Sequence, residues 1–248
     1  MSEKAIVVVS GGLDSTTLLY YVCNKKITEA AKSSVPLKYE PIVLTFDYGQ
    51  KHGIEINHAK TTCQRLGLKW IRLGIPKLPG SALTENNMEV PKEDYSVETQ
   101  KLTVVPNRNM VFLSIAASYA IAEGARKVFY AAHYNDQAVY PDCRPEFVDG
   151  MNVALKVANY EPVEIEAPFI KMTKADIVTL GWGLGVPFQN TWSCYDPVLD
   201  VGALGEEYPM NMWSSNLSYI HCGICGTCRE RKIAFQTAGV KDPTRYAQ

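Results

Sequence analysis

The sequence predicts an α/β protein in which helices cover both faces of a Rossmann-like, doubly wound parallel sheet, followed by a small cysteine-rich C-terminal subdomain. Three observations carry this prediction: short apolar runs alternate with helical patterns, a glycine pair directly follows the first apolar run, and three cysteines gather near the C-terminus. Strands of a parallel sheet are buried on both faces, so they read as continuous apolar runs, as these do.

Apolar runs and helical patterns alternate along most of the chain. Strands are expected at 4–9, 41–46, 69–73, 127–132 and 163–166. Helices are expected near 14–26, 52–66, 108–124, 145–158 and 173–181. The polar connection 74–107 carries four prolines and is too long for an ordinary loop, so it is expected to be a lid or a disordered excursion.

The first strand leads into the string Ser10-Gly11-Gly12-Leu13-Asp14-Ser15-Thr16-Thr17. Two glycines allow unusual backbone angles, and the N–H groups of such a loop converge on an anion at the positive end of the following helix. The Walker pattern requires a lysine after its second glycine, where this chain has Leu13. The string therefore predicts a phosphate-binding loop of another kind. The alternative is a tight turn whose hydroxyl side chains only cap a helix.

Two further loops follow strand ends, at Asp47–His52 and His133–Arg144. In open parallel sheets ligands bind at the carboxyl ends of the strands, so these loops and the glycine loop are expected to surround one site.

Length, charge and cysteine use bound the class of protein. The 248 residues suit one large domain with a small appendage, and 46% hydrophobic residues are enough for a full core. A formal net charge of −1 gives no overall basic field, so no nucleic-acid partner is expected. No apolar run reaches membrane-spanning length and no signal peptide is recognisable, so a cytoplasmic protein is expected. Seven cysteines then indicate metal-binding or reactive roles rather than disulfides.

Cys222, Cys225 and Cys228 form two overlapping Cys-x-x-Cys steps, a spacing that directs thiolates toward one ion. A closed tetrahedral zinc site needs a fourth ligand, for which Cys194 is the best candidate and His221 the second. The alternatives are an iron–sulfur cluster, whose spacing is similar, and a set of free thiols. The absence of other redox signatures favours structural zinc.

These motifs together resemble the 7-cyano-7-deazaguanine synthase family over nearly the whole chain. Besides the glycine loop, the resemblance rests on Thr45–His52 with Glu55, Gly80–Thr84, Pro106–Asn109, Tyr140–Arg144 with Phe147, Ser193–Tyr195, Cys222–Arg231 and Asp242–Tyr246. The string Tyr140-Pro141-Asp142-Cys143-Arg144 is the most specific of these, whereas many families share the glycine loop.

The resemblance implies an adenine nucleotide alpha-hydrolase-like fold and a carbon–nitrogen ligase that splits ATP into AMP and pyrophosphate. ATP adenylates the carboxylate of 7-carboxy-7-deazaguanine, and ammonia displaces AMP to give an amide. A second ATP activates the amide oxygen, and loss of AMP leaves the nitrile. A homodimer is also implied.

Site residues follow from these motifs and positions. The residues expected to bind ATP are Val9, Ser10, Gly11, Gly12, Leu13, Asp14, Ser15, Thr16, Thr17, Leu18, Leu19 and Arg108. Those expected to bind the substrate are Tyr48, Gln50, His52, Asp136, Tyr140, Asp142 and Arg144. The expected catalytic group is Ser10, Asp14, Ser15, Asp136 and Arg144, and the expected zinc ligands are Cys194, Cys222, Cys225 and Cys228.

Two of these roles have a specific chemical reason. Asp14 is an acid in an anion site, so it is expected to hold Mg²⁺. Arg144 could pair bidentately with a substrate carboxylate, or could form only a structural ion pair with a neighbouring aspartate. The expected domains are an ATP-binding domain at 1–190 and a zinc-binding subdomain at 191–248.

The chain departs from the family pattern between Cys194 and Cys222, where residues 195–221 replace a short connection. This insertion carries four acids and no lysine or arginine, so it is expected to bind no nucleic acid. It also carries Met210, Met212, Trp213 and Tyr219, which are expected to be covered by this domain, a second copy or a protein partner. Two alternatives stay open: a related ligase that stops at the amide or conjugates the base to a protein amine, and a transfer-RNA thiolase.

Overall fold

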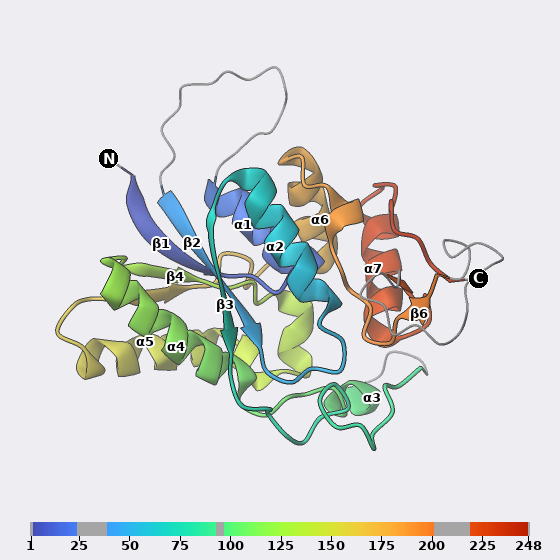
Figure 1. Ribbon diagram of the computed structural model, residues 1–248, viewed down its shortest axis with the longest axis horizontal. Helices are drawn as coiled ribbons and strands as arrows, with labels where there is room; N and C mark the ends of the chain where they lie inside the picture. The colour runs from blue at the N-terminus through green and yellow to red at the C-terminus, as the bar shows by residue number, and fades with distance from the viewer. Residues whose placement is uncertain (1, 24–38, 93–96, 201–218, 248) are drawn as a thin grey trace, which may run out of the picture.

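The structure is a computed structural model that describes residues 2–23, 39–92, 97–200 and 219–247, and it contains the predicted parallel sheet (Figure 1). The five strands are β1 (Glu3–Val8), β2 (Tyr39–Asp47), β3 (Lys69–Gly74), β4 (Lys127–Phe129) and β5 (Glu164–Glu166). Their order is β3-β2-β1-β4-β5, and every neighbouring pair is parallel. The direction of winding changes between β1 and β4, where open α/β sheets bind their ligands.

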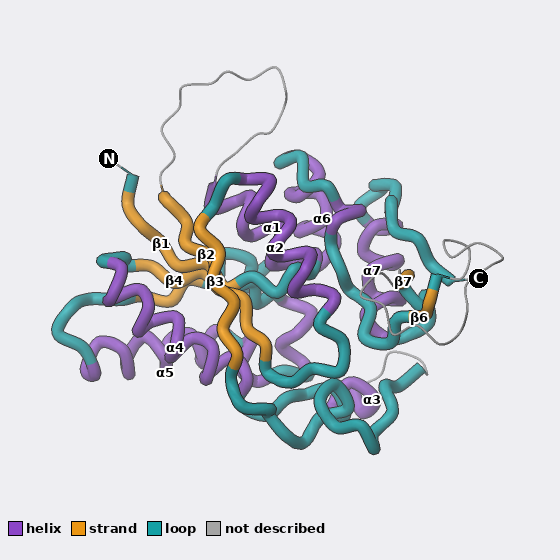
Figure 2. The backbone as a smooth tube through the Cα atoms, in the orientation of Figure 1, coloured by secondary structure: helices purple, strands orange, loops and turns teal. Residues whose placement is uncertain are grey.

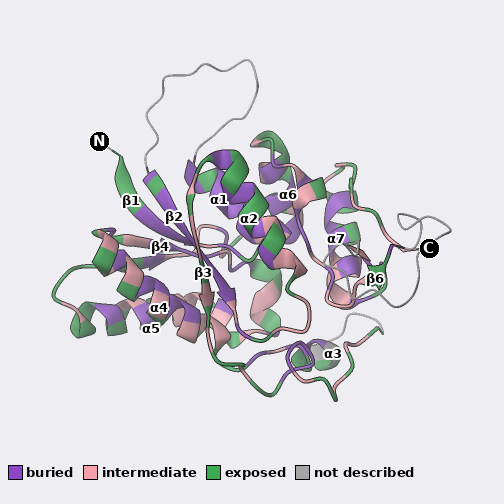
Figure 3. Cartoon of the chain, viewed as in Figure 1, coloured by how far each residue is buried: buried purple, intermediate pink, exposed green. Residues whose placement is uncertain are grey.

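Helices cover both faces of the sheet (Figure 2). One face carries α1 (Leu13–Cys23), α2 (Ile54–Leu66), α6 (Lys174–Gly183) and α7 (Gly226–Thr237), and the other carries α4 (Arg108–Glu123) and α5 (Pro145–Ala158). Successive β1 side chains point to opposite faces of the sheet, where two hydrophobic cores lie. Val7 packs in the core with α1 and α6, and Ile6 packs in the core with α4 and α5. β2 and the second half of β1 are largely buried, whereas the edge strand β3 is partly exposed (Figure 3). The helices on both faces of this parallel sheet confirm the doubly wound α/β prediction.

The observed elements match the predicted ones with small shifts at their ends. β4 ends at Phe129, three residues before the predicted end, because the chain from Tyr130 leaves the ladder to form the wall of a cleft. Short 3₁₀ helices at Tyr134–Ala138, Pro141–Cys143 and Phe188–Asn190 shape the loops beyond it.

Helix α7 was not predicted, and its buried face explains why. The residues that it buries are Cys228, Arg231, Ala234 and Phe235. Their spacing is helical, but a cysteine and an arginine occupy places where an apolar pattern needs aliphatic side chains. Periodicity alone therefore gave no signal for this helix.

The long connection after β3 is packed where the structure describes it, so it is not the disordered excursion that was one expectation. Leu83 and Val105 join the hydrophobic core. Near its middle, Lys92 Nζ lies 2.9 Å from Asp196 Oδ2, and Arg229 Nη2 donates to the Lys92 carbonyl at 3.0 Å. The connection also contains α3 (Val97–Lys101). It forms a wall that is tied to the C-terminal segment.

The C-terminal segment shares the main core. Phe235 of α7 packs edge-to-face on Phe188, with ring centroids 5.0 Å apart. The ends of the insertion pair as antiparallel strands β6 (Val198–Leu199) and β7 (Tyr219–Ile220). Its residues Glu206, Glu207, Met210, Met212 and Trp213 lie outside the described residues. The domain boundary at 190/191 stays a prediction. Within the described residues, no helix is long and apolar enough to cross a membrane.

Candidate functional site

The loop between β1 and α1 has a geometry that only glycine supports at Gly11. This residue has φ +96°, and a Cβ added to it would lie 2.0 Å from the carbonyl oxygen of Glu55. The close approach lets the first turn of α2 pack against the loop. Ser15 closes the loop from the other side, because its Oγ accepts a hydrogen bond from the Ser10 N–H at 3.2 Å and lies 3.0 Å from Ser10 Oγ.

This loop opens onto a cleft of about 270 Å³ at the carboxyl ends of the strands. The predicted site residues that line it are Val9, Ser10, Gly12, Leu13, Asp14, Ser15, Tyr48, Gln50, Arg108, Asp136 and Tyr140. The cleft therefore gathers loops from β1, β2 and β4 around one space, as their positions at strand ends predict.

Other predicted site residues do not line this cleft: Gly11, Thr16, Thr17, Leu18, Leu19, His52, Asp142 and Arg144. Thr17 lies inside α1, where its hydroxyl donates to the Leu13 carbonyl at 2.9 Å. Asp142 accepts the Asn109 N–H at 3.1 Å, so it caps the start of α4. Arg144 is exposed, and its Nε donates to the Gln137 carbonyl at 2.8 Å. Ligand contacts for these residues stay predictions.

One half of the cleft, beside the glycine loop, holds an ionic cluster. Lys174 Nζ lies 3.3 Å from Asp14 Oδ2 and 2.6 Å from Glu230 Oε2. His133 Nε2 lies 3.3 Å from Asp136 Oδ2 and 3.8 Å from Asp14 Oδ2. Three carboxylates thus surround one lysine and one histidine at the end of β1. This arrangement can bind a cation, or an anion that is held through a bound cation.

The charges in this cluster control its proton affinities. Burial raises the pKa of Asp14, but the charges of Lys174 and His133 outweigh it, so the pKa lies below its usual range. Burial lowers the pKa of Lys174, but Asp14, Glu230 and Asp136 hold it well above its usual value. Asp14 is therefore ionised and Lys174 charged at neutral pH. Asp14 Oδ1, His133 Nδ1 and Glu230 Oε1 are buried without a hydrogen-bond partner among the described residues, so the cluster is open to further ligands.

Lys174, His133 and Glu230 were not identified as site residues from the sequence. Lys174 follows β5 at the start of α6, so its place after a strand end was a usable signal. Glu230 lies two residues beyond the last cysteine, on the unpredicted helix α7. Only the packing of α7 against α6 brings it to the cleft.

The other half of the cleft is aromatic, with one cation. Phe46 and Phe112 stack with centroids 4.1 Å apart at 6°, and the ring of Tyr48 packs against Phe112. Arg108 Nη1 donates to the Tyr48 hydroxyl at 3.4 Å, and Tyr140 also lines this wall. A planar ring can stack on these aromatic side chains, and the guanidinium can donate hydrogen bonds to acceptor groups on that ring.

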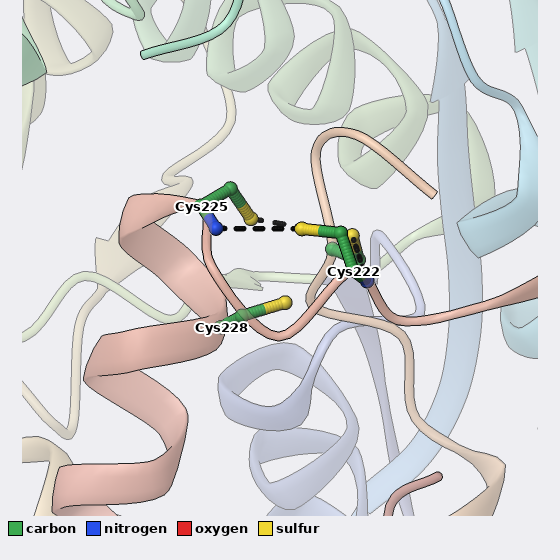
Figure 4. A group of neighbouring side chains, drawn as sticks. Cys222, Cys225 and Cys228 are labelled. Atoms are coloured by element: carbon green, nitrogen blue, oxygen red, sulfur yellow. Dashed lines mark hydrogen bonds between the residues drawn. The ribbon is translucent and has the colours of Figure 1, made fainter. Parts of the chain in front are cut away.

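The four cysteines near the C-terminus converge as the spacing predicts. The sulfur atoms of Cys194, Cys222, Cys225 and Cys228 all lie within 4.8 Å of one another, and all four residues are buried. Figure 4 shows three of them pointing toward a common centre. A tetrahedral zinc with Zn–S bonds of about 2.3 Å needs sulfurs roughly 3.8 Å apart, and the Cys194–Cys225 sulfurs lie 4.0 Å apart.

Backbone N–H groups support the thiolates. The Cys222 N–H donates to Cys194 Sγ and the Cys225 N–H to Cys222 Sγ, both at 3.3 Å. Such donors orient and stabilise sulfur ligands. The donor set therefore fits a metal ion such as zinc. His221, the second candidate, instead accepts a hydrogen bond from the Ser193 N–H at its Nε2, 3.1 Å away.

Arg231 joins the two segments that supply these cysteines. It is fully buried, and its guanidinium donates to the Phe188 carbonyl at 3.0 Å and to the hydroxyls of Thr191 at 2.8 Å and Ser193 at 3.1 Å. Asp242 Oδ1 lies 3.3 Å from its Nε and supplies the opposite charge. The segment before Cys194 is thereby fixed to α7, which carries Cys228.

Comparison with known proteins identifies close relatives. The family model described as "Queuosine biosynthesis protein QueC" matches residues 4–239. The chain is 44% identical over 246 residues to the 7-cyano-7-deazaguanine synthase of Caldicellulosiruptor saccharolyticus, covering 98% of this chain and 95% of that protein. It is 45% identical to the protein of the same name from Archaeoglobus fulgidus, covering 97% and 89%. Among solved structures, the U34-tRNA thiolase NcsA from Methanococcus maripaludis aligns with a TM-score of 0.48 at 16% identity, covering 79% of this chain and 61% of that one.

Proposed function

The chain belongs to the QueC family, and from that premise we propose that it is a 7-cyano-7-deazaguanine synthase. It uses ATP and ammonia to convert the carboxylate of 7-carboxy-7-deazaguanine first to an amide and then to a nitrile. The observation that carries this proposal is the two-part cleft. One half of the cleft contains a phosphate loop without the Walker lysine and the ionic cluster. The other half contains the aromatic residues and Arg108.

The loop half is suited to splitting ATP between its α- and β-phosphates. N–H groups at the start of α1 face the position where pyrophosphate gains charge as it leaves. Lys174 supplies a positive charge 3.3 Å from Asp14, at the same end of the sheet. Asp14 has an ionised carboxylate with one free oxygen, so it is the residue that would hold Mg²⁺. A bound Mg²⁺ would offset phosphate charge.

The aromatic half is suited to the deazaguanine ring. Tyr48 and Tyr140 offer flat surfaces and hydroxyls, and Arg108 offers donors to a carboxylate or a ring oxygen. Asp136 lies 3.3 Å from His133 in the ionic cluster, which favours a role near the phosphates over a role in reading the base.

The cysteine cluster is proposed to hold zinc for structure alone. Four thiolates complete a tetrahedral shell and leave no position for water, so no catalytic step passes through the metal. Cys194 nevertheless lines the cleft, and the metal would therefore fix part of its wall.

Three further proposals rest on the family resemblance and the sequence. The protein is a homodimer, it works in the cytoplasm, and the apolar side chains of the 195–221 insertion are covered by its own domain, a second copy or a protein partner. The acids of this insertion make a nucleic-acid partner unfavourable. Sedimentation of the purified protein tests the first of these directly.

The decisive experiment is a product assay by mass spectrometry. Purified protein is incubated with ATP, Mg²⁺, ammonium and 7-carboxy-7-deazaguanine, and the expected products are the nitrile, AMP and pyrophosphate. ADP release, or an amide that accumulates as the end product, would overturn the proposal. Ser15→Ala should lower ATP turnover about tenfold, because it removes the hydroxyl that organises the phosphate loop.

A further inference from the structure

Among the described residues, four carboxylates line the cleft, and that of Glu55 accepts its hydrogen bond from the neutral amide of Gln50. Asp14 and Glu230 share Lys174, and Asp136 lies 3.3 Å from His133. The charge of Lys174 lowers the affinity of Asp14 for a proton, whereas burial raises the pKa of Glu55, as it does that of Asp136 in the ionic cluster. Glu55 is the acid of the two that is held by a neutral amide.

The side chain of Gln50 positions this carboxylate. Gln50 Oε1 accepts the Tyr48 N–H at 2.9 Å, and that bond fixes which end of the amide is oxygen. Gln50 Nε2 therefore has to be the donor, and it donates to the Phe46 carbonyl at 3.4 Å and to Glu55 Oε1 at 3.3 Å. The donor is neutral, so it orients Glu55 without pairing it with a charge.

The packing of α2 on the phosphate loop brings Glu55 to the reacting end of the cleft. The Glu55 carbonyl oxygen lies 2.0 Å from the place that a Cβ on Gly11 would take, so this turn directly contacts the loop. In an adenylate-forming enzyme the activated carbon is bonded through oxygen to the α-phosphate. Glu55 lies beside the phosphate loop and also lines the cleft proposed to hold the substrate. We therefore expect its carboxylate to reach the activated carbon and the nitrogen that bonds to it.

We propose that Glu55 is the general base that removes protons from the nitrogen during amide and nitrile formation. This inference rests on the proposed function. In the first stage, ammonia forms the C–N bond, AMP leaves with the C–O bond pair, and one nitrogen proton passes to the Glu55 carboxylate. In the second stage, the amide oxygen attacks the α-phosphate, pyrophosphate leaves and one N–H proton is removed. The C–O bond then breaks to release AMP, and loss of the last N–H proton gives the nitrile.

The surroundings of Glu55 suit this role at neutral pH. Burial raises its pKa to about 7, and the hydrogen bond from Gln50 lowers it only in part. The charged and titratable groups that face it are Arg108 on α4, which lowers the pKa, and Asp47 and Tyr48 at the end of β2. Asp47 is itself paired with Arg72. A base is most effective when its pKa lies close to the working pH.

The test separates adenylation from proton removal in the full-length protein. Substrate-dependent exchange of pyrophosphate into ATP reports adenylation of 7-carboxy-7-deazaguanine, and single-turnover conversion of the amide to the nitrile reports proton removal. Starting from the amide avoids the ionisation of ammonium. In Glu55→Gln, exchange should stay within about threefold of wild type, while nitrile formation should fall about 100-fold or more. The wild-type rate should rise with pH through the neutral range, and this rise should disappear in the variant.

Glu55→Asp keeps a carboxylate one methylene shorter, and it should recover part of the rate and the pH dependence. Glu123→Gln, which removes a surface carboxylate paired with Lys69, is the matched control. Equal loss of exchange and nitrile formation in Glu55→Gln would overturn the inference, as would an unchanged rate or an unchanged pH profile. If Glu55→Gln does not fold, a wild-type single-turnover rate without any ionisation in the neutral range overturns it equally. Absence of nitrile and exchange in the wild type would instead contradict the proposed function.

Discussion

The ammonium group of Lys174 lies 3.3 Å from a carboxylate oxygen of Asp14, and this contact joins two segments 160 residues apart in the sequence. Asp14 lies in the first turn of α1 and Lys174 is the first residue of α6, so the pair ties the starts of both helices at the phosphate loop. Glu230 of α7 contacts the same lysine at 2.6 Å. One side chain therefore balances two acids that otherwise repel each other.

Lys174→Met should destabilise the protein by about 3 kcal/mol, because it leaves two largely buried carboxylates without their cation. ATP turnover should fall as well, since the positive charge beside the phosphate loop is lost. Chemical denaturation and an AMP-release assay measure the two effects. Lys171→Met, which changes an exposed lysine three residues earlier, is the control and should leave both unchanged. Equal stability of the two variants would contradict this role for Lys174.

Gly11→Ala should cost at least about 3 kcal/mol or abolish ATP binding, because the new Cβ would lie 2.0 Å from the Glu55 carbonyl. Gly124→Ala is the control that separates the cost of this steric clash from the cost of a positive φ at a residue with a side chain. Gly124 also has a positive φ, +69°, but nothing lies within 4 Å of its added Cβ. It should cost only about 1 kcal/mol. Thermal unfolding and ATP binding of both variants check the prediction, and similar losses in the two would show that conformation alone matters.

Cys225→Ser should lower the metal content and the stability together, because binding of a structural metal is part of the folding free energy. Elemental analysis of the wild type should give about one zinc per chain. Cys63→Ala is the control: this buried cysteine lies outside the cluster, so the variant should lose some stability and keep its metal. A brown wild-type protein with acid-labile sulfide would instead indicate an iron–sulfur cluster.

Arg231→Lys should destabilise the protein by about 3 kcal/mol, although the charge is retained. A lysine cannot reproduce the fork of donors that reaches Phe188, Thr191 and Ser193 at once. The segment before Cys194 should loosen, so zinc should also dissociate more readily on addition of a chelator. Arg65→Lys, at an exposed position of α2, should change stability by less than about 0.5 kcal/mol.

Glu55→Gln should make the protein more stable than wild type above neutral pH. In the unfolded chain Glu55 ionises near its ordinary pKa of 4.5, whereas burial raises the folded pKa to about 7. Between these values the unfolded state has lost the proton and the folded state still holds it, so stability falls as pH rises. The gap corresponds to about 3 kcal/mol. Both proteins are denatured at mildly acidic and at mildly alkaline pH. The difference between their free energies of unfolding should grow toward alkaline pH. A constant difference would contradict the raised pKa.

Much of the fold could be predicted because its signals are local. The apolar runs that became β1 and β2 supply residues to the cores on both faces, and such strands need continuous apolar sequence. The glycine loop and the Cys-x-x-Cys steps are likewise local, because a tight turn and a chelating turn each need particular residues at fixed spacing. The cleft location followed from strand ends that share one edge of a parallel sheet.

The partners of the site residues could not be predicted in the same way. Arg144 and Asp142 belong to the most specific motif, yet Arg144 is bonded to Gln137 and Asp142 caps α4, so neither lines the cleft. Lys174 meets both Asp14 and Glu230 only because α6 packs against α1 and against α7.

By itself, the sequence determined the α/β class, the phosphate loop and the set of four cysteines, since each depends on residues that are close in the chain or on the period of a single element. The tertiary structure alone decided which charges lie together in the cleft. It also left Glu55 beside a neutral amide, while Asp14 and Glu230 lie beside Lys174 and Asp136 lies beside His133. The physical reason is that proton affinity depends on burial and on charges a few ångströms away, and these are supplied by segments that are distant in sequence.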